Sequence, residues 1–132
     1  MAANEVTEMR VLTLRAFSLL IAFQIYLARG NFASLHDKIR RCPVSPKSRS
    51  PLSVDDICRA IDLACIWYPR EVLCLQRSAA TTYLLRRHGF SAQLVVGARP
   101  MPFQAHAWVE VDSRIVNDRP YIAEMYAVLD RY

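Results

Sequence analysis

The pattern of hydrophobic residues divides the chain into a helical first part and a strand-rich second part. The segment from Glu5 to Ala28 is apolar nearly all round and predicts one long helix, with Gly30 just beyond its end. Its most apolar stretch, Ala16–Ala28, is shorter than a membrane span requires, and no small-residue signal-peptidase site follows it. We therefore expect no membrane span, but a helix whose apolar residues pack on the domain or against a partner.

Local signals predict two more helices. The polar segment 31–50 contains several X-Pro pairs and predicts a loop or an extended link. Ser53, with Asp56 three residues later, forms a capping-box pattern that predicts the start of a second helix. A third helix is predicted to begin near Cys74 and to end just before Gly89.

Beyond the third helix the pattern becomes typical of β-strands. The predicted elements are strands at 90–98, 105–111 and 114–117, a loop at 99–102, a two-residue turn at 112–113, and a short helix on the sheet within 120–132. Helices followed by an antiparallel meander predict an α+β fold. We expect a single domain over 1–132, with an N-terminal helix and linker in 1–50 and a catalytic core in 51–132.

Composition narrows the class of protein. The chain has 132 residues, of which 53% are hydrophobic, and this favours one folded domain. The net charge of +5 comes from scattered arginines without interleaved aromatics, so nucleic-acid binding is not expected. The four cysteines are irregularly spaced and form no CxxC pair, which favours neither a metal site nor a disulfide scaffold. We expect reduced thiols in a cytoplasmic protein and no cofactor.

Cys74 is the candidate nucleophile. Near a helix N-terminus, the dipole and free backbone N–H groups favour a thiolate over a thiol. The same N–H groups can donate to an oxyanion that forms on a substrate carbonyl. The alternative is that Cys74 is an ordinary buried cysteine, because free cysteines are often buried.

His106 and Asp118 are the candidate partners of this thiol. His106 begins an apolar strand and would serve as a base beside a thiol, or else as a core histidine bonded to a carbonyl. With the turn at Asp112-Ser113, Ala107 faces Asp118, so that Asp118 is a diagonal neighbour of His106. A carboxylate there would fix the tautomer and orientation of the imidazole.

Three further side chains are candidates for substrate contact. Arg77 follows Cys74 within one helical turn. It would contact substrate or raise the local positive potential, or else it would lie on a solvated helix face or form a structural ion pair. Trp108 and Glu110 lie on the same predicted strand as His106. Glu110 is expected to face solvent or to take a polar role at the edge of a pocket.

Several segments carry a resemblance to a known family. They are Cys74-Leu75-Gln76-Arg77-Ser78, Leu84-Leu85-Arg86-Arg87-His88-Gly89-Phe90, Leu94-Val95-Val96-Gly97 and Pro102-Phe103-Gln104-Ala105-His106-Ala107-Trp108-Val109-Glu110-Val111. Together they resemble the transglutaminase-like proteins of lasso-peptide biosynthesis, which act as leader peptidases. The resemblance runs roughly from Ser53 to Asp118. The chain departs from it at Asp112-Ser113, where relatives commonly have Asp-Gly.

The resemblance implies a papain-like or transglutaminase-like core with a Cys-His-Asp triad. Cys74 matches the family nucleophile, His106 the base and Asp118 the acid, and the reaction would be hydrolysis of the amide that joins leader to core in a ribosomally made precursor peptide. A separate leader-recognition protein is implied, because the chain opens directly with a helix, and the product would pass to an ATP-dependent cyclase. Two alternatives stay open: an acyltransferase on the same scaffold, and a non-catalytic peptide-binding protein.

Overall fold

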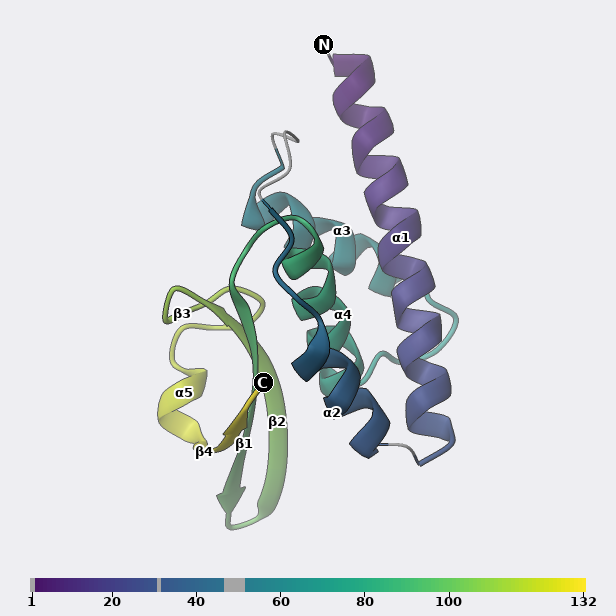
Figure 1. Ribbon diagram of the computed structural model, residues 1–132. Helices are drawn as coiled ribbons and strands as arrows, with labels where there is room; N and C mark the ends of the chain where they lie inside the picture. The colour runs from purple at the N-terminus through teal and green to yellow at the C-terminus, as the bar shows by residue number, and fades with distance from the viewer. Residues whose placement is uncertain (1, 31, 47–51) are drawn as a thin grey trace.

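The fold is a layer of helices on one face of an antiparallel sheet. The computed structural model describes residues 2–30, 32–46 and 52–132. Its elements are α1 (Ala2–Ala28), α2 (Phe32–Arg41), α3 (Val54–Trp67), α4 (Cys74–Arg87), β1 (Ala92–Pro100), β2 (Phe103–Val111), β3 (Arg114–Ile115), α5 (Ile122–Met125) and β4 (Ala127–Arg131). The strands lie in the order β3-β2-β1-β4, and α4 packs directly on β1 and β2 (Figure 1). The predicted α+β class is confirmed.

The local signals in the sequence correspond to observed structure. At the start of α3, Ser53 Oγ accepts a hydrogen bond from Asp56 N at 3.1 Å, and Asp56 Oδ2 accepts one from Ser53 N at 3.0 Å. At the β2–β3 turn, Asp112 and Ser113 have φ values of 51° and 64°. Two consecutive left-handed residues form the tight turn that suits an antiparallel hairpin. Helix α4 begins at Cys74, as predicted.

The prediction of a loop over 31–50 is wrong for residues 32–41, which form α2. Position 31 and positions 47–50 lie outside the described residues. Leu35 and Ile39, four residues apart, are both fully buried and give α2 its packed face. The other residues of α2 are mostly polar, and the X-Pro pairs come after the helix ends. Because only two side chains supply the apolar face, packing against α1 and α4 stabilises this helix more than its own sequence does.

The C-terminal segment also differs from the prediction. The expected short helix is present as the four-residue α5, but β4 follows it and pairs antiparallel with β1 at the edge of the sheet. Leu94 and Tyr132 exchange backbone hydrogen bonds of 3.1 and 2.8 Å just beyond the ladder. All five residues of β4 are exposed. Its sequence has three apolar residues followed by two charged ones, so it lacks the alternation of apolar and polar positions that would have predicted a strand.

Arg86, near the end of α4, joins the helices to the sheet. Its guanidinium is buried and donates to Ala92 O at 2.8 Å and to Tyr132 O at 2.7 Å, on the sheet side. It also donates to the carbonyls of Ile39 and Cys42, at the end of α2. Burial lowers the pKa of this guanidinium from its ordinary value. These four hydrogen bonds tie the end of α2, the start of β1 and the C-terminal residue to α4.

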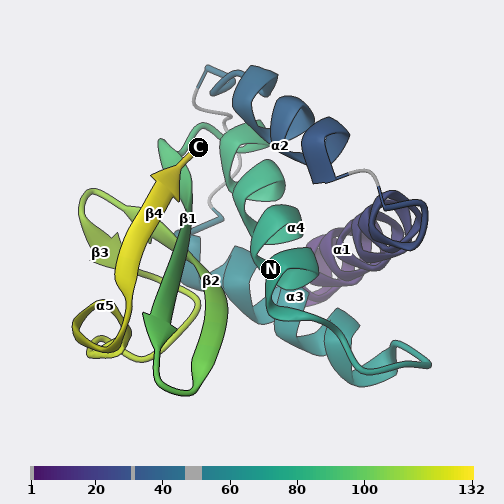
Figure 2. The ribbon, with the colours of Figure 1, turned by 90° about the horizontal axis from the view of Figure 1, so that it is seen from below.

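Helix α1 is the outermost helix of the layer (Figure 2). One side of it is fully or almost fully buried through Leu12, Ala16, Leu20 and Phe23. By length and composition alone, Ala3–Ala28 is also long and apolar enough to cross a membrane, a property that it shares with core helices of soluble proteins and with signal sequences. The stretch Ala16–Ala28, which is too short to span a membrane, is only the C-terminal half of this helix.

Candidate active site

Cys74 lies at the N-terminus of α4 with its side chain exposed. The residue before it, Leu73, is the N-cap and has no side chain able to bond the first-turn N–H groups. Those N–H groups therefore point beyond the helix without a side-chain cap, beside the thiol. The alternative reading of Cys74 as a buried structural cysteine does not fit this position. The other three cysteines, at 42, 58 and 65, are buried or partly buried.

Gln76 fixes this helix end from inside the protein. Its side chain is fully buried, and its Nε2 donates to Leu20 O of α1 at 2.7 Å. Its Oε1 accepts a hydrogen bond from Leu73 N at 3.3 Å. Gln76 was not among the predicted site residues. The signal that could have identified it is its place at the third helical position, where a glutamine can cap the helix N-terminus.

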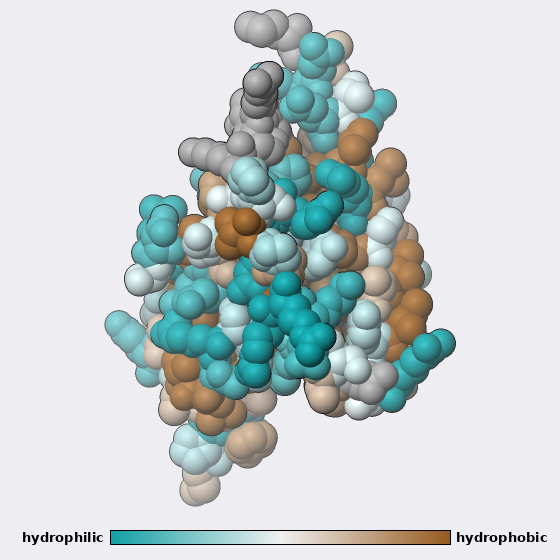
Figure 3. Space-filling view, in the orientation of Figure 1, coloured by the Kyte–Doolittle hydropathy of each residue, from teal (hydrophilic) through white to brown (hydrophobic). Residues whose placement is uncertain are grey.

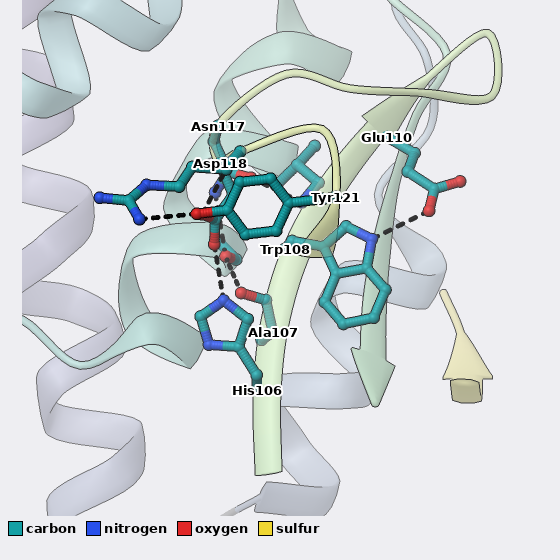
Figure 4. A network of polar contacts seen from close by, with 10 residues as sticks. His106, Ala107, Trp108, Glu110, Asn117, Asp118 and Tyr121 are labelled. Carbon is teal, nitrogen blue, oxygen red and sulfur yellow. Dashed lines mark hydrogen bonds and ion pairs between the residues drawn. The ribbon is translucent and has the colours of Figure 1, made fainter. Parts of the chain in front are cut away.

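His106 and Asp118 are in direct contact. His106 Nε2 lies 2.6 Å from Asp118 Oδ2, and both side chains are about three-quarters buried (Figure 4). The other carboxylate oxygen accepts a hydrogen bond from Arg119 N at 2.7 Å. The imidazole stacks on the ring of Tyr126, with centroids 5.3 Å apart. Within the described part of the chain, Nδ1 of His106 has no hydrogen-bond partner, so it is the ring nitrogen open to a reacting group.

A polar bridge holds α4 against the strand that carries His106. Ser78 Oγ donates to Ala107 O at 3.1 Å and accepts a hydrogen bond from Asn117 Nδ2 at 3.0 Å. Ser78 lies one helical turn beyond Cys74, on the same side of α4. Ala107 directly follows His106 on β2. The bridge therefore brings the helix end with Cys74 and the strand with His106 to the same part of the molecule.

Trp108 and Glu110 are enclosed rather than open to a substrate. Trp108 is fully buried, and its Nε1 donates to Glu110 Oε2 at 2.9 Å. Glu110 is 8% exposed and accepts a second hydrogen bond from Arg131 at 2.7 Å. Burial alone would raise the pKa of Glu110, but these two hydrogen bonds and the charge of Arg131 outweigh it and lower the pKa. The expectation that Glu110 faces solvent is wrong, and the burial of both residues favours support of β2 over substrate contact.

Arg77 is held in an ion pair with Asp62, which joins α4 to α3. Of the roles considered for Arg77, the structural ion pair is the one observed. Across residues 2–30, 32–46 and 52–132, no group of three or more His, Cys, Asp or Glu side chains is placed to hold a metal ion.

Comparison with known proteins identifies the superfamily to which this chain belongs. A family model described as the transglutaminase-like superfamily matches residues 17–131, and the chain belongs to this superfamily. The chain is also similar to the microcin J25-processing protein McjB of Escherichia coli, with 38% identity over 56 residues. That match covers 42% of this chain and 27% of McjB, so the chain spans only about a quarter of the relative's length. No solved structure matches. These findings confirm the resemblance seen in the sequence.

Proposed function

We propose that this protein is a cysteine peptidase that removes the leader from a lasso-type precursor peptide, with Cys74, His106 and Asp118 as its triad. The observation that carries the proposal is the 2.6 Å contact between His106 and Asp118, on a strand tied to the helix that begins at the exposed Cys74. Membership of the transglutaminase-like superfamily supports cysteine-based chemistry. The similarity to a protein named for processing microcin J25 supports the substrate class.

In the proposed mechanism, each ring nitrogen of His106 has its own task. Asp118 accepts a hydrogen bond from Nε2–H, which leaves Nδ1 unprotonated and free to accept a proton. In the proposed reaction Nδ1 takes the proton of Cys74, and the thiolate adds to the carbonyl carbon of the scissile amide. First-turn N–H groups of α4 donate to the oxyanion that forms.

The second half of the reaction regenerates the thiol. The C–N bond breaks as His106 delivers its proton to the leaving amine, and the acyl group stays on Cys74 as a thioester. His106 then removes a proton from water, whose oxygen adds to the thioester carbonyl. The carboxylic acid leaves, and the sulfur recovers its proton. Addition of an amine instead of water would make the same site an acyltransferase.

The proposal includes partners. The precursor peptide is the substrate, a separate leader-recognition protein presents it, and an ATP-dependent cyclase uses the freed core in the cytoplasm. We expect cleavage by the peptidase alone to be slow, because this proposal assigns binding of the leader to the recognition protein. Equal cleavage rates with and without the recognition protein would contradict this part.

Mass spectrometry of a lasso-type precursor, incubated with this protein and a leader-recognition protein, tests the activity. Wild type and the control Cys58→Ala should release leader and core, whereas Cys74→Ala should release neither. Cleavage by Cys74→Ala would exclude Cys74 as the nucleophile. An amine adduct in place of a free carboxylate would indicate acyl transfer. Failure of the wild type to cleave would overturn the peptidase proposal.

Thiol reactivity tests the site without any substrate. Burial, followed by the charges of Asp62 and Asp55, raises the pKa of Cys58 to about 11. Limiting iodoacetamide should therefore label Cys74 well before Cys58, as read by peptide mapping. His106→Ala should slow Cys74 labelling at pH 6 by about tenfold or more, because the imidazole can then no longer take the proton of the thiol. An unchanged rate would mean that His106 does not act on Cys74.

A further inference from the structure

The outward side of α1 carries an apolar stripe that nothing in the described structure covers. It consists of four aliphatic side chains, each between 43% and 67% exposed, and a serine at its centre. We refer to this set as the outer α1 face: Val11, Leu14, Ser18, Ile21 and Ile25. Figure 3 shows a hydrophobic band along the α1 edge of the molecule, and Figure 2 shows this helix at the periphery, with its far side free.

The spacing of the outer α1 face is that of a helix–helix seam. Its members follow one another at intervals of three and four residues, the repeat by which one helix packs along another. Ser18, a small residue, lies at its centre, where two helix backbones would approach most closely. No charged residue occurs from position 16 to position 28, although a solvated helix face normally carries charges. The face therefore fits a second helix better than water.

The charges of α1 indicate which helix fits. In a parallel pair of α1 helices, Arg10 and Arg15 would lie beside the same arginines of the other copy and repel them. In an antiparallel pair centred near Ser18, both arginines would instead lie beside the uncharged half of the other helix. Glu8 would then lie close to Arg29 of the second copy, and the two helix dipoles would also oppose each other favourably.

We propose that the outer α1 face binds α1 of a second copy of this chain in antiparallel orientation, forming a two-fold symmetric dimer. Such an interface is made of the same patch on both copies, which requires the self-complementary charge pattern that α1 has. The opposite side of α1 packs on α2, α3 and α4, so each helix would lie between its own domain and the second copy. The inference does not rest on the peptidase proposal, because none of the proposed triad lies on α1.

Sedimentation velocity of the full chain, from about 1 to 100 μM, tests the dimer. Wild type should sediment as a dimer at the upper concentrations. Ile21→Glu should raise the dissociation constant by about tenfold or more, because a carboxylate would be buried in the seam. Val128→Glu is the matched control: it is equally exposed at 43% but lies on β4, and it should leave the dimer unchanged. A monomeric wild type, or a dimer insensitive to Ile21→Glu, would overturn the proposal.

A charge exchange tests the antiparallel orientation. Glu8→Arg and Arg29→Glu should each weaken the dimer, and the double variant should restore it because the pair is reversed on both copies. A double variant that dimerises no better than either single variant would overturn this orientation.

Flotation with vesicles of phosphatidylcholine and phosphatidylserine tests whether a membrane, rather than a second copy of the chain, covers the outer α1 face. A monomer whose vesicle binding is lost in Ile21→Glu would show that lipid covers the face instead.

Discussion

Replacing Asp118 by asparagine changes one atom type in the proposed site and keeps the shape of the side chain. Asp118 Oδ2 lies 2.6 Å from His106 Nε2, and in the proposed site it keeps the ring proton on that nitrogen. The new amide can turn either its oxygen or its NH₂ group toward the ring. With the NH₂ group facing Nε2, the imidazole proton shifts to Nδ1, and His106 can no longer accept the proton of Cys74 from that nitrogen.

The size of the effect follows from this contact. A hydrogen bond to a charged group contributes about 1.5–3 kcal/mol. At about 1.4 kcal/mol for each factor of ten, its loss in the transition state slows the reaction by about 10- to 150-fold. The wrong tautomer adds to this loss, so we expect kcat/KM to fall by about 10² to 10⁴. The free energy of unfolding should change much less, because the amide can still accept a hydrogen bond from Arg119 N and fills the same space.

The assay is leader release measured by chromatography and mass spectrometry across a pH series, with urea unfolding of the same preparations. Asp112→Asn is the matched control, because it removes an exposed carboxylate from the β2–β3 turn, where asparagine accepts a positive φ readily. It should leave kcat/KM near the wild-type value. If Asp118→Asn keeps kcat/KM within about twofold of wild type, with the same pH profile, Asp118 does not orient His106 for catalysis.

Two further substitutions test the support of β2. Gly97→Ala would place a Cβ 2.8 Å from Trp108 Cη2 and should lower the free energy of unfolding by about 2–3 kcal/mol. Gly30→Ala, with φ of 68° and no atom within 4 Å of the new Cβ, should lower it by about 1 kcal/mol. Equal losses in urea unfolding would contradict the crowding at Gly97. The lowered pKa of Glu110 means that its carboxylate stabilises the fold above its unfolded-state pKa and that this stabilisation is lost as pH falls through the folded-state value. Wild type should therefore lose stability more steeply below about pH 4.5 than Glu110→Gln in acid titrations of unfolding, and parallel curves would refute this.

Features set by neighbouring residues could be predicted from the sequence. The capping box at Ser53 needs only Asp56 three positions later, and the turn at Asp112-Ser113 needs only two residues that tolerate a positive φ. This turn also fixes the first cross-strand pairs of the β2–β3 hairpin, and these pairs match the predicted register. Cys74 at a helix start also follows from local pattern, and this made it the first candidate nucleophile.

Features set by distant residues could not be predicted in the same way. Glu110 looks like a solvent-facing strand residue until Arg131 on β4, 21 positions later, supplies its partner. Helix α2 depends on packing of Leu35 and Ile39 against other helices rather than on its own propensity. In both cases the deciding contact spans elements whose relative placement the sequence pattern does not define.

The early end of β3 explains how Asp118 reaches His106. In a continuing ladder Asp118 would lie opposite Ala107, and because cross-strand pairs share a face, its side chain would point away from His106. Instead, Val109 N donates to the side-chain oxygen of Asn117 at 2.8 Å, where a ladder would supply a backbone carbonyl. This side chain ends the pairing, so Asp118 leaves the strand geometry and its carboxylate turns to Nε2 of the imidazole. The sequence therefore predicted the contact between His106 and Asp118 from a ladder register that ends at Asn117, one residue before Asp118.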